Sequence, residues 1–388
     1  MLAARWHDRD DIRIEDVALR EPRHDEVLVK VHWCGICGTD LEEYRAGPLI
    51  IPTGEPHPLS GRMAPLTLGH EIVGEVVRAS PDGSGPAVGT YVVPDVVNGC
   101  GECWWCLRHE EGLCPSVCVP GQQDDGGLAE FMIAKARTCV PVPAGLPMET
   151  AVLAEPAAVA VRAVRKVPEI IGAVALVIGG GTIGQLTAQA ALAAGAAQCW
   201  LVDPSDYRRR FAQAHSAVQA CAPDELDALV AGLGAPGIDV VFECSGAAGQ
   251  LTRSFELVRP GGVVVAVGLG TVTQPIPLPA LVLGERRLIG SAAHLWDADV
   301  AQAVRMLADG RLDAVGLVTH RIPLHELVTV ALPLLSQPDP EVLKIAIDCR
   351  RMPDVHQRGE DTLSRAVDGS PPRPDPAVAF IPRRRAAS

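Results

Sequence analysis

Four cysteines lie within fifteen residues of one segment, C-G-E-C-W-W-C-L-R-H-E-E-G-L-C, and this spacing can bring four sulfur atoms onto one metal ion. The arrangement C-x2-C-x2-C-x7-C closes a tetrahedral site with no open position, which is typical of a structural zinc. An iron–sulfur cluster is the alternative, because ferredoxin motifs also end before a proline, here Pro115. The longer last gap favours zinc, so residues 98–116 are predicted to form a zinc lobe held by Cys100, Cys103, Cys106 and Cys114.

A second set of metal-ligand residue types lies upstream. Cys37 stands in C-G-I-C-G-T-D-L-E-E-Y, and G-H-E supplies His70 and Glu71 thirty-three residues later. A thiolate, an imidazole and a carboxylate are all zinc ligands, and three protein ligands with a fourth position open define a catalytic zinc. Taken alone, these three residues are better explained as a buried cysteine and a capping histidine than as a catalytic zinc site. The zinc interpretation therefore depends on the rest of the chain.

The segment G-G-G-T-I-G indicates a nucleotide-binding loop, because it follows a continuous apolar run and precedes good helix formers. Gly179 permits a tight turn, Gly181 lets the backbone approach a pyrophosphate, and Gly184 allows close helix packing. Asp203 follows nineteen residues after Gly184, where a carboxylate accepts from a ribose 2′-hydroxyl and repels a 2′-phosphate. The sequence therefore favours NAD over NADP, and the arginines at 208–210 are the argument for NADP.

The secondary structure that could position these residues differs between the chain before and after Glu155. The first 155 residues are predicted to be mainly β with loops, because short alternating runs recur at 27–32, 72–77 and 91–93. After Glu155, Ala-rich helical stretches alternate with continuous apolar runs at 173–178, 199–203, 238–243 and 262–267. This pattern predicts a doubly wound parallel sheet and an α/β fold.

The last part of the chain is expected to return to the first domain. A helix is predicted at 298–307 and a strand at 342–348. The tail from residue 351, rich in Pro, Arg and Asp without an apolar period, is expected to be disordered.

Composition limits the classes of function. The 388 residues are 48% hydrophobic and 21% charged, as in an ordinary globular protein, and the net charge of −13 argues against a nucleic-acid partner. No apolar stretch reaches the ~20 residues of a membrane span, and charges interrupt the start before any signal peptide, so a cytoplasmic protein is expected. Twelve cysteines fit a reducing compartment that keeps thiolates free for metal.

Together these motifs resemble the zinc-dependent medium-chain alcohol and polyol dehydrogenases over about residues 1–350. The segments C-G-I-C-G-T-D-L-E-E-Y and A-P-L-T-L-G-H-E are most similar to 2,3-butanediol dehydrogenases, with sorbitol and threonine dehydrogenases as near relatives. The resemblance implies a GroES-like catalytic domain at 1–155, a Rossmann domain at 156–293 and a return segment at 294–350. It also implies a homodimer or homotetramer and leaves the tail at 351–388 outside both domains.

The resemblance implies the roles of particular residues. The catalytic zinc would be held by Cys37, His70 and Glu71, with Glu155 as a carboxylate that reaches the metal and exchanges with water. Thr39 would relay the proton of the alcohol while a hydride passes to the nicotinamide. The cofactors would be two Zn²⁺ ions and one NAD per chain. The expected cofactor contacts are Gly179, Gly181, Thr182, Ile183, Gly184, Asp203, Arg208, Cys244, Val267, Gly268 and Leu269.

One departure from the family's pattern affects the reaction. Butanediol dehydrogenases usually carry histidine where this chain has Glu42, so a carboxylate takes over the proton exit or the exit is lost. The expected activity is the reversible conversion of a vicinal diol such as 2,3-butanediol into an acyloin such as acetoin. Alternatives are a polyol, cyclitol, aminocyclitol or threonine dehydrogenase. An alternative of another class is a noncatalytic NAD-binding protein.

Overall fold

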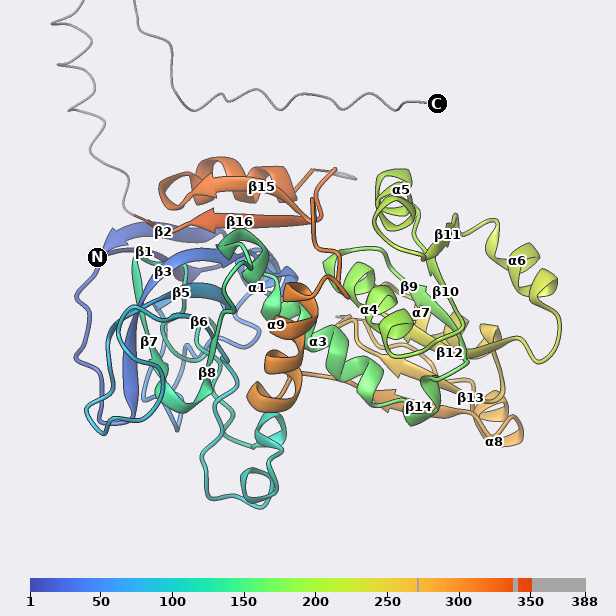
Figure 1. Ribbon diagram of the computed structural model, residues 1–388, viewed down its shortest axis with the longest axis horizontal. Coiled ribbons are helices and arrows are strands. Elements are labelled where there is room, and N and C mark those ends of the chain that lie inside the picture. The colour runs from blue at the N-terminus through green and yellow to red at the C-terminus, as the bar shows by residue number, and fades with distance from the viewer. Residues whose placement is uncertain (271, 338–340, 351–388) are drawn as a thin grey trace, which may run out of the picture. The chain divides into compact units, whose positions relative to one another are not determined.

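The computed structural model describes residues 1–270, 272–337 and 341–350, and residues 1–350 form one compact unit (Figure 1). The predicted disordered tail, residues 351–388, lies outside the described residues. Within the described part, the strands form sheets of three, six and seven strands, and helices cover the six-stranded sheet. The predicted α/β class is confirmed.

The seven-stranded sheet carries the metal-ligand residue types. Its order is β15-β16-β3-β5-β6-β8, and β7 also pairs with β3. The alternation in V-L-V-K-V-H buries Val27, Val29 and Val31 and leaves Lys30 exposed. The strands predicted at the three alternating runs are confirmed. The bounds are Glu26–Gly35 (β3), Glu71–Arg78 (β5), Tyr91–Pro94 (β6), Phe131–Lys135 (β7), Cys139–Pro141 (β8), Val318–Pro323 (β15) and Lys344–Asp348 (β16).

A smaller sheet covers the chain start, which the sequence analysis did not assign. Its order is β2-β1-β4, with strands Leu2–Asp8 (β1), Asp11–Asp16 (β2) and Leu66–Thr67 (β4). Trp6 is fully buried and its Nε1 donates to the Glu43 carbonyl at 3.0 Å. This bond ties the hairpin to the helix that follows Cys37.

The six-stranded sheet is parallel throughout, in the order β11-β10-β9-β12-β13-β14. The strand order reverses between β9 and β12, and ligands of such sheets bind outside the strand ends at this point. The four continuous apolar runs are confirmed as strands. The bounds are Val174–Ile178 (β9), Gln198–Val202 (β10), Gln219–Cys221 (β11), Ile238–Glu243 (β12), Val258–Ala266 (β13) and Arg287–Gly290 (β14).

Helix α3 (Ala154–Arg165) packs on α4 (Thr182–Ala193), on α9 (Ala301–Ala308) and on β5, so it contacts elements that flank both large sheets (Figure 1). The helix predicted at 298–307 begins as a π-helical turn, Trp296–Val300, and continues as α9. The remaining helices are Gly38–Ala46 (α1), Met148–Ala151 (α2), Asp206–His215 (α5), Leu226–Leu233 (α6), Gln250–Leu257 (α7), Leu278–Leu283 (α8) and Leu332–Leu335 (α10).

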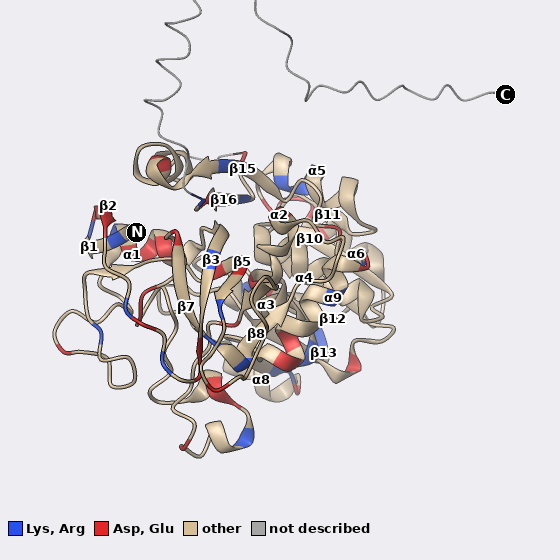
Figure 2. Cartoon of the chain, turned by 60° about the vertical axis from the view of Figure 1, so that its left-hand side comes forward, with Lys and Arg blue, Asp and Glu red and all other residues tan. Residues whose placement is uncertain are grey.

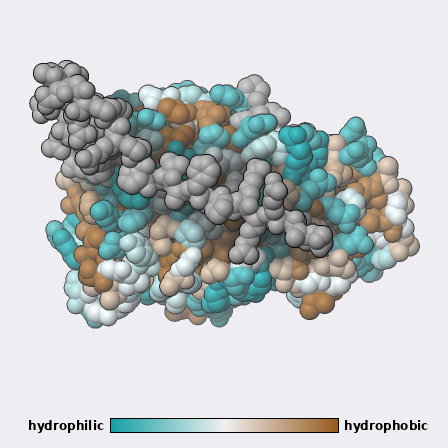
Figure 3. Space-filling view, turned by 45° about the horizontal axis from the view of Figure 1, so that its top comes forward, coloured by the Kyte–Doolittle hydropathy of each residue, from teal (hydrophilic) through white to brown (hydrophobic). Residues whose placement is uncertain are grey.

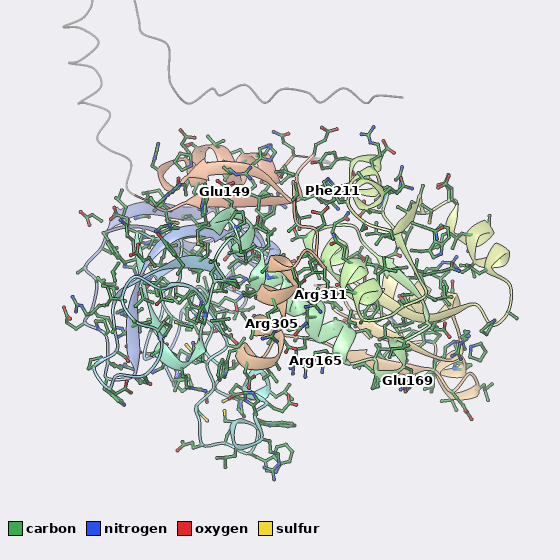
Figure 4. All side chains as sticks on the ribbon, in the orientation of Figure 1. Glu149, Arg165, Glu169, Phe211, Arg305 and Arg311 are labelled. Carbon is green, nitrogen blue, oxygen red and sulfur yellow. The ribbon has the colours of Figure 1, made fainter. Side chains whose placement is uncertain are left out.

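The last described strands join the seven-stranded sheet, and the strand predicted at 342–348 is observed as β16. Strand β16 runs antiparallel to β3, and β15 runs parallel to β16 (Figure 1). Arg321 of β15 donates from Nε to Glu149 of α2 at 2.6 Å, and Figure 4 labels this glutamate. Residues from both ends of the described chain therefore share one sheet.

The described helices include none with the length and apolar character needed to span a membrane.

Candidate active site and metal sites

The four lobe cysteines form a compact set of sulfur ligands. Among the described residues, they are the one group of three or more His, Cys, Asp or Glu whose ligand atoms all lie within 4.8 Å of one another. The Sγ atoms of Cys100 and Cys106 are 4.0 Å apart, close to the roughly 3.8 Å edge of a tetrahedron with Zn–S bonds of about 2.3 Å. These separations leave room for a single ion, and four sulfurs suit zinc.

Backbone N–H groups favour the thiolate form in the lobe. The Cys114 Sγ accepts from the N–H of Cys100 and of Ser116, each at 3.4 Å. The backbone N–H groups of Glu102 and Cys103 lower the pKa of the Cys100 thiol to about 7. Burial has the opposite effect on two of the other sulfurs, because it raises the pKa of Cys106 to about 12 and also raises that of Cys114. Cys100 is therefore the lobe thiol that the backbone prepares best as a thiolate ligand at neutral pH.

Cys37, Thr39 and His70 come together where α1 begins. Cys37 is the residue before the helix, and its N–H donates to the Asp40 side chain at 2.9 Å. Gly69, which precedes His70, has a φ of 92°, and a Cβ there would lie 2.6 Å from the Cys34 sulfur. Glycine at this point lets the chain enter β5 close to β3. His70 Nε2 then lies 3.4 Å from Thr39 Oγ1.

The surroundings of His70 are rich in negative charge. The ring is buried, and its Nδ1 lies 3.6 Å from Asp40 Oδ1 without a hydrogen bond to a described residue. Burial opposes protonation, but the neighbouring Asp40 carboxylate and Cys37 sulfur outweigh it and raise the pKa of His70 well above its usual value. A thiolate and an imidazole in an electronegative pocket form a donor set that fits a zinc ion.

Glu71 faces a lysine from the last described strand. Lys344 Nζ lies 2.6 Å from Oε1 and 2.7 Å from Oε2 of Glu71, and it also donates to the Ile36 carbonyl at 2.9 Å. Burial disfavours the ammonium, but Glu71 and Cys37 outweigh it and raise the pKa of Lys344. Gly35 makes room for the pair, since a Cβ there would lie 2.0 Å from Glu71 Oε2. The structure thus places the Glu71 carboxylate on Lys344.

Glu155 belongs to a buried chain of three side chains. It lies in the first turn of α3, and its Oε1 is 3.0 Å from His294 Nε2. The other ring nitrogen of His294 lies 3.3 Å from Asp95 Oδ1. Burial disfavours the imidazolium, but Asp95 and Glu155 together raise the pKa of His294 to about 10. His294 therefore holds the Glu155 carboxylate in one orientation.

The predicted glycine loop joins β9 to α4. Gly179 has a φ of 97°, and a Cβ at Gly184 would lie 1.7 Å from the Gly179 carbonyl oxygen, so both positions require glycine. A Cβ at Gly181 would meet nothing within 4 Å, so the loop is open to a ligand at this residue. Thr182 begins α4, and its hydroxyl donates to the Leu343 carbonyl at 2.6 Å.

Asp203 follows β10 and braces the glycine loop. One carboxylate oxygen accepts from the Gly180 N–H at 2.6 Å and the other from the Ser205 N–H at 2.8 Å. Arg208 approaches the same carboxylate at 3.4 Å. The structure thus brings the predicted Asp203 and Arg208 beside the predicted loop.

One cavity of about 380 Å³ joins the two groups of predicted residues. Cys37, Thr39, His70 and Glu155 line it on one side. The predicted cofactor residues that also line it are Ile183, Cys244, Val267, Gly268 and Leu269. Glu71 is not among the lining residues, and Gly179, Gly181, Thr182, Gly184, Asp203 and Arg208 lie outside this cavity along the glycine loop.

The sequence analysis missed Lys344, His294, Asp95 and Gln122. Lys344 had a usable signal, because a single lysine in the apolar strand V-L-K-I-A-I-D needs a buried partner. His294 and Asp95 are 199 positions apart in the chain and carry no motif, so folding alone brings them together. Gln122 lies in a Gly-rich loop, and its Nε2 donates to Thr39 Oγ1 at 3.4 Å.

Two family matches cover the regions that carry these sites. Residues 23–144 match the alcohol dehydrogenase GroES-like domain, and residues 182–309 match the zinc-binding dehydrogenase family. The predicted GroES-like and Rossmann architecture is thereby confirmed. The chain belongs to the zinc-binding alcohol dehydrogenases, and it is an oxidoreductase of that class.

Particular relatives show which members of the family it is similar to. The (R,R)-butanediol dehydrogenase of Bacillus subtilis is 34% identical over 331 residues, which cover 84% of this chain and 94% of the relative. The crystal structure of 2R,3R-butanediol dehydrogenase from Bacillus subtilis has a TM-score of 0.82 at 31% identity and covers 89% of this chain and 99% of that one.

Two further relatives widen the comparison. The L-threonine 3-dehydrogenase of Pyrococcus horikoshii is 32% identical over 311 residues, covering 79% of this chain and 86% of the relative. A zinc-binding dehydrogenase from Sinorhizobium meliloti 1021 bound to NADP has a TM-score of 0.79 at 29% identity and covers 89% of this chain and 98% of that one. The predicted family, with butanediol and threonine dehydrogenases as relatives, is confirmed.

Proposed function

We propose that this protein is a zinc-dependent, NAD-linked secondary-alcohol dehydrogenase that interconverts a vicinal diol, such as 2,3-butanediol, and an acyloin, such as acetoin. The observation that carries the proposal is the shared cavity, which is lined by Cys37, His70 and Glu155 on one side and by residues 267–269 of the nucleotide-binding sheet on the other. The butanediol dehydrogenase named above supports the diol as reference substrate.

Two metal ions per chain are part of the proposal. The lobe cysteines would hold a structural zinc, and Cys37, His70 and Glu155 would hold the catalytic one. Glu71 is proposed as a ligand that exchanges between the metal and Lys344, because the Lys344 ion pair occupies its carboxylate in this structure. When bound, zinc supplies Lewis acidity to the substrate oxygen and the nicotinamide accepts the hydride.

Protein groups around this site would orient the substrate and move the proton. Thr39 Oγ1 lies 3.4 Å from His70 Nε2 and accepts from Gln122 at 3.4 Å, so it is placed to take the hydroxyl proton. The Asp40 carboxylate lies 3.6 Å from His70 Nδ1 and contributes negative charge beside the ring. Val159 and Ile183 contribute apolar surface to the cavity, which limits the access of water.

NAD is proposed over NADP. Support comes from the position of Asp203, which follows β10 and braces the loop at Gly180, because an acidic residue after the second strand of such folds reads the ribose 2′-hydroxyl. Arg208 is partly neutralised by Asp203. Asp203→Ala is expected to weaken NAD binding selectively and to improve the ratio of NADP to NAD use.

We propose a catalytic domain at 1–155 completed by 294–350, and a nucleotide domain at 156–293. Support comes from β15 and β16, which join the sheet of β3, and from β14, the last strand of the nucleotide sheet. We also propose a homodimer or homotetramer. Exposed apolar residues on α8, Leu278, Val282 and Leu283, are 63%, 61% and 85% exposed beside the edge strand β14 and offer a pairing surface.

The first experiment measures NADH formation by the purified protein with the stereoisomers of 2,3-butanediol, beside sorbitol, myo-inositol and L-threonine. The assay is run before and after chelation and after zinc repletion. Zinc-restored turnover of one butanediol isomer supports the metal, the cofactor and the substrate class together. Cys37→Ser is expected to abolish turnover and to spare NADH binding.

Turnover that survives complete removal of both metals would overturn the zinc-dependent mechanism. Silence on every diol, with two zinc ions and NADH bound, would overturn the substrate proposal and keep the family assignment.

A further inference from the structure

One carboxylate in the cavity, Glu42, stands where butanediol dehydrogenases usually carry histidine, and the proposed function above gives it no role. Glu42 lines the cavity near Thr39, and no described residue gives it a hydrogen bond or an ion pair. Burial first and then the neighbouring charge of Glu43 raise the pKa of Glu42. The Glu42 side chain is partly exposed, and none of its oxygens is buried without a partner, so the carboxylate is free to meet a ligand in the cavity.

The neighbouring residue on α1, Glu43, differs from Glu42 because its carboxylate has a structural role. The Glu43 carboxylate is buried and accepts from the backbone N–H groups of Leu49, Ile50 and Ile51, with distances of 3.0 Å to Leu49 and 3.1 Å to Ile51. Glu43 therefore holds the loop after α1. Glu42 makes none of these bonds and lines the cavity instead. Figure 2 shows the acidic residues of α1 in red.

The position of Glu42 on α1 suits recognition of a substrate. Thr39 and Glu42 are three residues apart and so share one face of the helix, with about 5–6 Å between their Cβ atoms. A substrate whose hydroxyl reaches Thr39 would therefore present the next one or two carbon atoms to Glu42. Other residues that line the cavity, such as Ile50, Val119 and Gln122, are apolar or neutral.

The charge of the cavity identifies the group that Glu42 would take. Among the described residues that line it, none is lysine or arginine. His294 also lines the cavity, but its ring is already paired with Asp95 and Glu155. A divalent ion would face Cys37 and Glu155, so Glu42 is the lining carboxylate without a cationic partner among the described residues. A substrate carboxylate would find no partner here, whereas an ammonium group would find one.

We propose that Glu42 binds the ammonium group of an amino alcohol, so that the preferred substrate carries a protonated amine on a carbon near the reacting secondary alcohol and carries no carboxylate. This inference rests on the proposed zinc-dependent alcohol dehydrogenase activity. It puts an amino alcohol in place of the diol as the preferred substrate, so that the diol becomes a slower substrate of the same site. It separates the preferred substrate from neutral diols, and also from L-threonine, whose carboxylate the cavity does not match.

The test uses pairs of substrates that differ only in one group. The zinc-loaded protein with NAD is assayed with 3-amino-2-butanol against 2,3-butanediol, and with 2-aminocyclohexanol against 1,2-cyclohexanediol. A charge-assisted hydrogen bond predicts a kcat/KM about tenfold or more higher for each amino alcohol than for its diol. Glu42→Gln is expected to lower this ratio by about tenfold or more, and Glu42→Asp, which keeps the charge, to retain part of it.

Matched controls separate recognition from other effects. Glu55→Gln removes one charge from an exposed loop and is expected to leave the ratio unchanged. A wild-type ratio at or below one, or a ratio that Glu42→Gln does not change, overturns the proposal. An equal loss for amine and diol in Glu42→Gln assigns Glu42 to the proton path and also overturns it.

Binding distinguishes failure of this inference from failure of the proposed function. If no alcohol is oxidised, the proposed function fails, and the affinity of the zinc–NADH complex for cyclohexylamine against cyclohexanol still tests Glu42. Tighter binding of the amine that disappears in Glu42→Gln supports the ammonium site. Equal binding of the amine by both proteins overturns it.

Discussion

At the scale of single residues, the Lys344–Glu71 pair has the largest expected effect on stability. Both side chains are buried, so removal of the lysine leaves an uncompensated carboxylate. Lys344→Met is expected to lower the free energy of unfolding by about 3–5 kcal/mol. The double variant Lys344→Met with Glu71→Gln should recover most of the loss. Urea unfolding of the metal-free proteins measures both, and equal stability of the single and double variants would contradict the prediction.

His294 is expected to act on the metal through Glu155. His294→Leu removes the donor that lies 3.0 Å from the Glu155 carboxylate. Side chains of this kind typically change metal affinity by about 10–100-fold, so zinc should pass to a coloured chelator faster by a similar factor. NADH binding serves as the control for folding. Unchanged zinc release in His294→Leu would show that the histidine does not position this ligand.

At the scale of elements, the start of β3 is expected to be sensitive to acid. Glu26 accepts from Arg20 at 2.6 Å and from the Arg23 N–H at 2.8 Å. Burial opposes its ionisation, but these donors lower the pKa of Glu26 to about 2, from an ordinary value of 4.5. Because the folded pKa lies below the unfolded one, the stabilisation is complete above about pH 4.5 and is lost as the pH falls towards 2.

The variant Glu26→Gln tests whether this stabilisation is lost as the pH falls. The variant should be less stable at pH 7 by about 1–2 kcal/mol, a discounted value because Arg20 is partly exposed, and the difference should vanish near pH 2. Glu21→Gln is the matched control, since Glu21 pairs with Arg78 on the surface and is 83% exposed. A constant difference between wild type and Glu26→Gln at every pH would contradict the prediction.

Predictability from the sequence also differed between elements. The strands of the nucleotide sheet were predictable because burial on both faces requires continuous apolar runs, as in 238–243. The hairpin of β1 and β2 was not, since L-A-A-R-W-H-D lacks a clear alternation and depends on Trp6 packing against α1. Motifs located Cys37, His70 and the glycine loop. His294 carries no motif and enters the site by long-range packing alone, whereas Lys344 is marked in the sequence only as a single lysine in an apolar strand.

At the scale of the whole molecule, the cysteine lobe is tied to the helices beside the cavity. His109 lies 2.8 Å from Asp297, and Arg162 of α3 lies 3.1 Å from Glu110. Arg165, labelled in Figure 4, and Arg162 both pair with the fully buried Asp299. On the face of the molecule that Figure 3 shows, polar and apolar residues are intermingled.

Because these contacts tie the lobe to the helices, loss of the lobe metal is expected to lower the stability of the whole protein. Cys103→Ser should reduce the zinc content by one ion per chain and lower Tm by roughly 5 °C, in line with a loss of a few kcal/mol. Cys118→Ser, at a buried cysteine outside the four-sulfur set, is the control and should keep its zinc content. Equal zinc content in Cys103→Ser and wild type would contradict the assignment of the lobe.

The return of the chain through β16 also sets the order in which the protein can mature on the ribosome. Lys344 is synthesised 273 residues after Glu71. At a translation rate of about 5–20 residues per second, Lys344 is added roughly 14 to 55 s after Glu71, and until then Glu71 has no lysine to pair with. During that interval the seven-stranded sheet lacks β15 and β16, so the Lys344–Glu71 pair forms only when almost all of the described chain has been translated.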